Sequence, residues 1–244
     1  MKAKARNTRL DGRRADEIRP VVITPDFVRT AAGSCLIEMG DTRVICTASI
    51  EEGVPPWRAG SGEGWVTAEY GMLPASTGRR KSRPGLKPDS RGLEIQRLIG
   101  RALRGVVRFE RLGEHTITLD CDVLQADGGT RTAAITGAYV ALVRAVQLGQ
   151  AEGRFVRGAL REEVAAVSVG VVKGRAVLDL CYAEDVSADV DLNVAMTRSG
   201  KFVELQGTGE GAPFDEKQLH AMLHLAKKGC TMLFRAQRSA LRIK

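Results

Sequence analysis

The feature that most constrains this chain is a glycine-rich turn, residues 125–132, between two segments of different periodicity. The segment before it, 115–124, alternates apolar and polar side chains, which predicts a strand with one face in a core. After it, apolar residues recur at helical spacing from Ala134 to Val146, which predicts a helix. The middle of the chain is therefore expected to be a strand, a tight turn and a helix.

This arrangement places Gly129 and Thr130 at a helix N-terminus, where unpaired N–H groups and the helix dipole attract anions. Arg131 follows, and its planar guanidinium matches the geometry of a phosphate. The turn thus predicts a phosphate site, although double glycines also occur as plain turn chemistry, and both interpretations stay open. A P-loop is excluded because no Gly-Lys-Ser/Thr closes the turn, and the glycine spacing differs from a dinucleotide-binding fingerprint.

Composition narrows the class of protein. The 244 residues suffice for one large domain or two fused halves, and a formal net charge of +8 favours a polyanionic partner. Five scattered cysteines without a Cys-x-x-Cys pair predict reduced thiols in the cytoplasm rather than disulfides or a zinc site. Residues 1–4 do not lead into a signal peptide's apolar region, and no apolar run approaches the ~20 residues of a membrane span, so no membrane association is expected.

Alternation and turn signals along the chain predict an α+β fold. Strands are expected at 21–27, 34–39, 42–50, 66–73, 115–124, 164–172, 175–182, 189–196 and 201–206. Helices are expected at 93–107, after the glycine-rich turn, and from Asp215, where Gln218 completes a capping box. The run Gly207–Gly211 predicts a tight bend. Because a hairpin followed by a helix occurs in both halves, the fold is expected to be a duplicated unit.

Two basic features have more than one interpretation. The loop 74–92, called the basic loop below, has no core-facing pattern and contains the cluster Arg79, Arg80, Lys81 and Arg83. This cluster is either a solvated segment or a track for a nucleic-acid backbone. A second basic stripe follows the 93–107 helix and consists of Arg97, Arg101, Arg104 and Arg108. Because like charges repel on a free surface, the stripe predicts contact with carboxylates, another subunit or RNA.

Two carboxylates, Asp185 and Asp191, flank a short connection between expected strands. They can converge on one Mg²⁺, which proteins hold with one or two carboxylates plus substrate phosphates, or they are solvated turn residues. His220 and His224 lie four residues apart on the last helix without a third ligand, and they are interpreted as structural or surface residues. None of the three histidines lies in a recognisable nucleophile motif.

Several long runs of residues occur in an order that points to one family. They are Asp11-Gly12-Arg13 with Arg19-Pro20, Gly64 to Tyr70, Glu94 to Arg101, Cys121 to Thr132 with Ile135 to Ala138, Asp189 to Asn193, and Phe202 to Gly209. With these runs the chain resembles the bacterial ribonuclease PH family over nearly its whole length. The resemblance implies a phosphate-dependent 3′→5′ exoribonuclease, a tRNA nucleotidyltransferase that trims the 3′ ends of tRNA precursors and of other structured RNAs such as rRNA.

The resemblance also implies an architecture. It is a duplicated fold of mixed sheets and helices with a left-handed βαβ crossover, against the usual hand. Residues 1–244 are then one catalytic domain of two similar halves, roughly 1–150 and 151–244. A cytoplasmic homohexameric ring is the implied assembly.

Carried over residue by residue, the resemblance implies three sets. The phosphate-binding set is Arg91, Gly129, Thr130 and Arg131. The metal-binding carboxylates are Asp185 and Asp191, which implies Mg²⁺ beside inorganic phosphate as co-substrate and, together with Arg131, gives the catalytic residues. The tRNA-holding stretch contains Arg79, Arg80 and Arg83, with Lys81 between them. Val186 and Cys181 stand where relatives commonly carry serine and aspartate, so hydrogen bonding beside the site is expected to differ.

The implied mechanism is an in-line attack of inorganic phosphate on the last phosphodiester, which yields a nucleoside diphosphate and an RNA shorter by one nucleotide. Asp185 is a candidate proton donor. The competing class is a non-catalytic RNA-binding ring subunit of the same fold, which would lack part of the arginine and aspartate set. All six expected phosphate and metal positions are filled here, which favours the enzyme.

Overall fold

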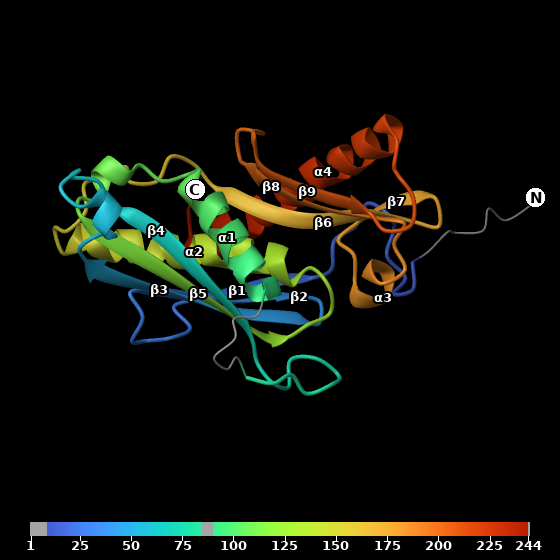
Figure 1. Ribbon diagram of the computed structural model, residues 1–244, viewed down its shortest axis with the longest axis horizontal. Helices are drawn as coiled ribbons and strands as arrows, with labels where there is room; N and C mark the ends of the chain where they lie inside the picture. The colour runs from blue at the N-terminus through green and yellow to red at the C-terminus, as the bar shows by residue number, and fades with distance from the viewer. Residues whose placement is uncertain (1–8, 84–89, 244) are drawn as a thin grey trace, which may run out of the picture.

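The structure is a computed structural model that describes residues 9–83 and 90–243. It consists of a mixed sheet and an antiparallel sheet, with the long helix α2 (Thr130–Ala151) packed against both (Figure 1). The expectation for residues 1–4 lies outside the described residues, and so does the part of the basic loop at 84–89.

The first sheet has the strand order β1-β2-β3-β5-β4. Its strands are β1 (Val21–Pro25), β2 (Gly33–Met39), β3 (Thr42–Glu52), β4 (Trp65–Met72) and β5 (His115–Gln125). Neighbouring strands are antiparallel except β4 and β5, which are parallel and are connected through α1 (Ser90–Arg104). A short 3-10 helix precedes β4 at Pro56–Arg58, and another precedes β5 at Phe109–Arg111. The alternation in 115–124 is confirmed, because its apolar side chains are buried.

The second sheet is antiparallel, with the strand order β7-β6-β8-β9. Its elements are β6 (Val164–Val172), β7 (Arg175–Leu178), the short helix α3 (Tyr182–Asp185), β8 (Val190–Thr197), β9 (Phe202–Gly209) and α4 (Glu216–Leu241). α4 packs on β6 and β7 and also reaches β1 of the first sheet. The predicted capping box is confirmed, since Asp215 Oδ1 accepts from the Gln218 N–H at 2.7 Å and Gln218 Oε1 accepts from the Asp215 N–H at 2.9 Å.

Helix α2 forms the centre of the core, because it contacts β2 and β3 on one side and β6 on the other. Both faces of this helix are covered, so it is apolar nearly all round rather than along one stripe. Gly137 lets it approach the first sheet closely, since a Cβ there would lie 2.7 Å from Ile37 and 2.9 Å from the Cys46 Sγ. Among the described residues, α2 alone is long and apolar enough to cross a membrane, and most of it is buried in the protein. The sequence expectation of no such apolar segment overlooked this core helix.

Several predicted boundaries are wrong, and among them the helix expected at 93–107 is α1, Ser90–Arg104. β7 ends at Leu178, four residues early, because Asp179 takes a left-handed conformation with φ 55°. Residues Tyr182–Asp185 form α3, so Asp185 lies at the end of a helical turn and not between two strands as expected. The expected bend at 207–211 begins later, because β9 continues to Gly209.

Most arginines of the basic stripe have interaction partners within the chain itself. Arg101 donates to both carboxylate oxygens of Glu204 on β9, at 2.9 and 2.8 Å. Arg104 lies over the Trp65 ring, with its guanidinium carbon 4.8 Å from the ring centroid. Arg108 lies beyond the end of α1 and donates to the Gly158 carbonyl at 2.8 Å. The predicted carboxylate partner is therefore confirmed for Arg101, and α1 is fastened to the second sheet through it.

Candidate active site

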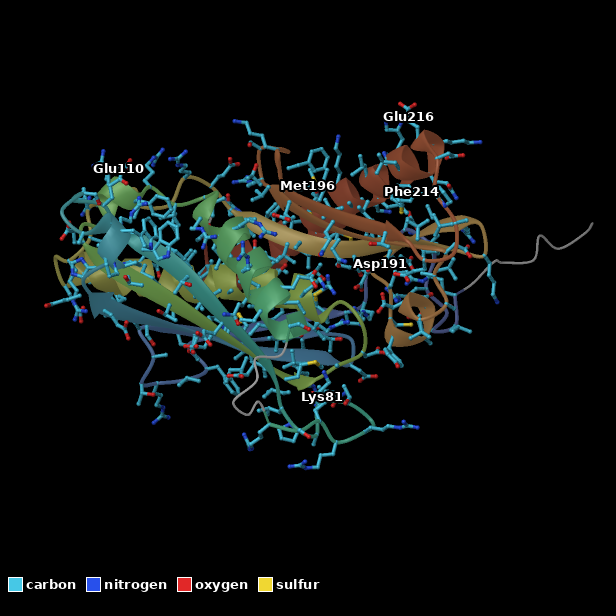
Figure 2. The ribbon with its side chains drawn as sticks, in the orientation of Figure 1. Lys81, Glu110, Asp191, Met196, Phe214 and Glu216 are labelled. Atoms are coloured by element: carbon cyan, nitrogen blue, oxygen red, sulfur yellow. The ribbon has the colours of Figure 1, made fainter. Side chains whose placement is uncertain are left out.

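A pocket of about 720 Å³ opens where the N-terminus of α2 meets α3 and the basic loop. Its wall includes seven of the residues expected to be functional, which are Arg79, Lys81, Arg91, Gly129, Thr130, Arg131 and Asp185. Asp191 is not among the residues that line the pocket. It lies on β8, two residues before Asn193, and Asn193 does line it. Figure 2 shows Asp191 on the second sheet and Lys81 on the loop after β4. Segments far apart in sequence thus form one concave site.

The turn of residues 127–131, called the glycine turn below, forms the floor of this site. Gly129 is the N-cap of α2, with φ 64°, and Gly128 has φ 73°, so both occupy the left-handed region that favours glycine. A Cβ on Gly128 would lie 2.6 Å from the Leu180 carbonyl oxygen. The glycines are therefore required by backbone conformation and, at Gly128, by close approach of a second segment. The predicted strand, turn and helix are confirmed.

The side chains of the glycine turn are held before any substrate arrives. The Thr130 hydroxyl lies 2.8 Å from the Tyr70 hydroxyl at the end of β4. Arg131 Nη1 donates to Gln206 Oε1 of β9 at 2.8 Å, and it lies 3.7 Å from the Glu94 carboxylate of α1. Burial raises the pKa of Tyr70, so its hydroxyl stays protonated and can donate. Tyr70 and Gln206 are contacts that sequence reasoning missed, although both lie in runs that carry the family resemblance.

The two carboxylates lie close enough to influence each other. Burial raises the pKa of Asp191 to about 6, with the negative charge of Asp185 adding to the shift, while Arg131 and a hydrogen bond from Asn193 oppose it. Burial also raises the pKa of Asp185, against the attraction of Arg131 and Arg91. The Asp191 Oδ1 atom is buried and has no hydrogen-bond partner, while its Oδ2 accepts from Asn193 Nδ2 at 3.2 Å.

This carboxylate pair fits a hard divalent cation. A buried carboxylate oxygen without a hydrogen-bond partner, beside a second carboxylate, is an acceptor pair that a cation would stabilise. Within residues 9–83 and 90–243, no group of three or more His, Cys, Asp or Glu side chains is arranged to hold a metal ion. Remaining ligands would have to come from substrate phosphates and water, which is how proteins usually hold Mg²⁺.

The described part of the basic loop runs beside the glycine turn. The Ala126 N–H donates to the Ser76 carbonyl at 2.8 Å, and the Lys81 N–H donates to the Pro74 carbonyl at 2.8 Å. Arg79 and Lys81 line the pocket, whereas Arg80 and Arg83 are exposed outside its wall. The loop therefore presents positive charge at the pocket mouth.

The other expected side chains lie away from this site. His220 and His224 are exposed on α4 and do not line the pocket, which confirms them as surface residues. All five cysteines are free and buried. Cys181 caps the start of α3, and burial raises its pKa, so it stays a neutral thiol beside the site. Val186 is exposed at the end of α3 and does not line the pocket.

Sequence reasoning gave no role to a set of buried polar residues behind the glycine turn. Arg19, only 4% exposed, pairs with the fully buried Asp179 at 2.6 Å. Thr42 is fully buried, and its hydroxyl donates to the Gly128 carbonyl at 2.7 Å. Arg19 stood only in a run that matches the family, and nothing local marked Asp179 or Thr42 as its partners.

Comparison with known proteins places this architecture in one family. Domain 1 of the 3′ exoribonuclease family matches residues 17–146, and domain 2 of that family matches residues 162–229. The chain is 57% identical over 238 residues to a ribonuclease PH of Corynebacterium efficiens, covering 97% of each chain. It is 55% identical over 235 residues to a ribonuclease PH of Corynebacterium kroppenstedtii, covering 96% of this chain and 92% of that relative.

Solved structures share the fold at lower identity. An Archaeoglobus fulgidus exosome structure with RNA bound to the active site superposes with a TM-score of 0.81 at 24% identity, covering 94% of this chain and 92% of that one. Rice (Oryza sativa) Rrp46 superposes with a TM-score of 0.77 at 18% identity, covering 96% of this chain and 100% of the other. Two matched domains, relatives aligned over nearly their whole length and a common fold lead to one conclusion. This chain belongs to the ribonuclease PH family of 3′ exoribonucleases.

Proposed function

We propose that this protein is a phosphate-dependent 3′→5′ exoribonuclease that shortens tRNA precursors, and other structured RNAs such as rRNA, one nucleotide at a time. The observation that carries the proposal is the single pocket that joins Arg91 and the glycine turn to Asp185. A helix N-terminus with two arginines suits an anion, and a carboxylate pair beside it suits a cation. Phosphorolysis needs both.

In this proposal inorganic phosphate binds to the N–H groups at the start of α2 and to the guanidinium groups of Arg131 and Arg91. Held there, it attacks the terminal phosphodiester in line, and the products are a nucleoside diphosphate and a shortened RNA. The side chains form no covalent bond with the substrate. Positioning of the two phosphates and neutralisation of their charge carry the rate. The contacts of Arg131 with Gln206 and of Thr130 with Tyr70 support this, because they hold the donors before substrate binds.

We propose Asp185 and Asp191 as the residues that hold Mg²⁺ against the scissile phosphate. When bound there, the ion would offset negative charge that develops on the phosphate and the leaving oxygen. Asp185 is also the candidate that gives a proton to that oxygen, which the upward shift of its pKa by burial supports. Holding the cation and donating the proton compete, because only an ionised carboxylate binds the metal well.

The basic loop is proposed to hold the RNA. Arg79 and Lys81 line the pocket mouth, and Arg80 and Arg83 extend the positive charge outward. A single-stranded 3′ end bound in the pocket would lie beside this loop, and its phosphates would contact these cations.

The assembly and domain organisation are part of the same proposal. We propose that residues 1–244 act as one cytoplasmic catalytic domain of two similar halves, roughly 1–150 and 151–244, and that six copies close a ring. The packing of α2 against both sheets supports the single unit. A left-handed β4–α1–β5 crossover is proposed with it. Sedimentation at micromolar concentration should give a hexamer, and a compact monomer alone would contradict the ring.

The decisive experiment incubates a tRNA precursor with Mg²⁺, with and without inorganic phosphate, and identifies the mononucleotide products. Nucleoside diphosphates that form only with phosphate are expected. Nucleoside monophosphates formed without it would mean hydrolysis, and no product would favour the non-catalytic ring subunit. Asp189→Asn is a matched control, because Asp189 is an exposed carboxylate next to β8 and should leave the products unchanged.

A further inference from the structure

A buried ion pair lies directly behind the glycine turn. Arg19 Nε donates to Asp179 Oδ2 at 2.9 Å and Arg19 Nη2 donates to Asp179 Oδ1 at 2.6 Å, which is a two-pronged contact. The backbone N–H of Arg19 also donates to Asp179 Oδ2 at 2.7 Å. Asp179 is fully buried and Arg19 is 4% exposed. The pair therefore has one fixed geometry.

The free side of the same guanidinium holds two carbonyls of the glycine turn. Arg19 Nη1 donates to the Asp127 carbonyl, and Nη2 lies 3.4 Å from the Gly128 carbonyl. Thr42 completes the contact, because its hydroxyl donates to the Gly128 carbonyl at 2.7 Å and accepts from the Asp127 N–H at 2.9 Å. Both carbonyls are thus anchored toward the protein interior.

Anchoring a carbonyl also orients the next N–H. In a planar trans peptide, the C=O of one residue and the N–H of the following residue point in opposite directions. With the Asp127 and Gly128 carbonyls turned toward Arg19 and Thr42, the N–H groups of Gly128 and Gly129 are turned away from them. Gly128 and Gly129 line the pocket, whereas Arg19 and Thr42 do not.

The same network reaches the segment that carries Asp185. Asp127 Oδ1 accepts from the Tyr182 N–H at 3.1 Å, at the first residue of α3. Arg9 donates to Glu184 Oε1 at 2.7 Å and to the Asp179 carbonyl at 2.8 Å. The glycine turn and α3 are therefore connected through Asp179 on one side and Asp127 on the other.

We propose that Arg19, Asp179 and Thr42 are positioning residues that preset the N–H groups of Gly128 and Gly129 for inorganic phosphate and keep them in register with Asp185. This inference rests on the proposed phosphorolytic function, and it assigns the phosphate dependence to residues that do not line the pocket. If these residues only stabilised the fold, their replacement would lower the amount of folded protein and leave the affinity of the folded fraction for phosphate unchanged.

The test separates phosphate binding from RNA binding. Thr42→Val removes both hydroxyl contacts with little change of shape and leaves the Arg19–Asp179 pair intact. Loss of these hydrogen bonds should raise the KM for phosphate roughly tenfold, the size expected for two neutral hydrogen bonds. The KM for RNA and the kcat at saturating phosphate should stay within about twofold, because the bound substrates still reach the same geometry. Equilibrium dialysis with inorganic phosphate, in the absence of RNA, should show the same weakening.

Two further variants sharpen the experiment. Thr116→Val is the matched control, because the Thr116 hydroxyl also donates to a glycine carbonyl, Gly53 at 2.8 Å, in the same sheet but away from the pocket. Thr116→Val should leave kcat and the KM values for phosphate and RNA within about twofold of those of the parent protein. Arg19→Lys keeps the charge beside Asp179 but loses the fork, so it should weaken phosphate binding more than Thr42→Val does. Arg19→Ala is less informative, because it leaves the buried Asp179 carboxylate with Arg13 Nη1, at 3.2 Å, as its remaining guanidinium partner and can fail to fold.

The outcomes are distinguishable. If folded Thr42→Val and Arg19→Lys bind phosphate as tightly as the parent protein does, the inference is wrong. If the apparent kcat falls in proportion to the folded fraction while the KM for phosphate stays unchanged, the residues are structural and the inference is equally wrong. If the unaltered protein degrades RNA without phosphate, the proposed function fails, whereas weaker phosphate binding by Thr42→Val in dialysis would still support the positioning role.

Discussion

The glycine turn and the basic loop are adjacent, and both offer positive potential to an anion, but they are built in opposite ways. In the glycine turn, the Asp127 and Gly128 carbonyls are anchored by Arg19 and Thr42, and the Arg131 side chain is held by Gln206. The basic loop is fixed at Ser76 and Lys81 through its backbone, while Arg79, Arg80 and Arg83 are exposed. A fixed donor set can stabilise one transition-state geometry, whereas exposed arginines can follow a flexible strand. In the proposed function, phosphorolysis and RNA binding are thus assigned to different segments.

The largest loss of activity is expected when the carboxylate pair beside the glycine turn is altered. Asp191→Asn removes a charge that the cation needs while keeping the side chain's shape. Phosphorolysis should fall by about 10³-fold or more, since a bound metal ion contributes several kcal/mol of charge stabilisation. Single-turnover rates across a Mg²⁺ titration measure this, with Asp189→Asn as control. Near-normal rates for both Asp191→Asn and Asp185→Asn would remove the metal site from this pair.

Arg131→Ala tests the proposed phosphate site at the glycine turn. Phosphorolysis should drop roughly 10²–10³-fold, the reduction expected when one preorganised donor is removed. Arg131→Lys should rescue poorly, because a point charge cannot replace a two-pronged contact. RNA affinity without phosphate should change little. Arg144→Ala, on the same helix with a partner in Asp26 at 3.0 Å, is the control. If Arg131→Ala instead abolished RNA binding and left phosphate dependence intact, Arg131 would belong with the basic loop.

The pH dependence of stability should report the raised pKa of Asp191 in the carboxylate pair. Folded Asp191 has a pKa of about 6 against 3.8 for an unperturbed aspartate, so it keeps its proton where the unfolded chain has lost it. Its contribution to stability is present below pH 3.8 and is lost as pH rises through about 6. Between those limits, the free energy of unfolding of metal-free protein should fall by about 1–2 kcal/mol more than in Asp191→Asn, allowing for solvent screening.

Urea unfolding in EDTA across this pH range gives the comparison. Mg²⁺ should reverse the trend, because it binds the ionised pair and so stabilises the folded state increasingly as pH rises. Equal pH slopes for the parent protein and Asp191→Asn would show that Asp191 ionises freely.

The smallest effect on chemistry is expected from the basic loop. Replacing Arg79, Arg80, Lys81 and Arg83 by Ser should weaken tRNA binding and flatten the log–log salt slope by ~0.7 for each RNA phosphate that the loop no longer neutralises. Cleavage of a short oligonucleotide should change about twofold at most, because the glycine turn is untouched. A control replaces four exposed cations elsewhere, Arg29, Arg154, Arg157 and Lys173. An unchanged slope and unchanged tRNA affinity would make the loop a solvated segment.

Much of the local structure could be predicted because its causes are local. The alternation in 115–124 and the helical spacing after it give β5 and α2, and the Asp215 and Gln218 pair gives the start of α4. The early end of β7 has a different cause, which lies in distant residues. Asp179 turns left-handed because its carboxylate and carbonyl are taken up by Arg19, Arg9 and Arg13. That ends β7 early and starts α3.

The sequence by itself determined the strand–turn–helix unit, the anion preference of its helix N-terminus and the family resemblance, because neighbouring residues encode periodicity, turn chemistry and motif. Only the tertiary structure decided which buried groups stand behind that unit. Arg19 and Asp179 are 160 residues apart, and Thr42 and Gly128 are 86 apart. No period or spacing links such residues. They become partners only when burial removes water from Asp179, whose carboxylate then accepts from Arg19 and Arg13 instead.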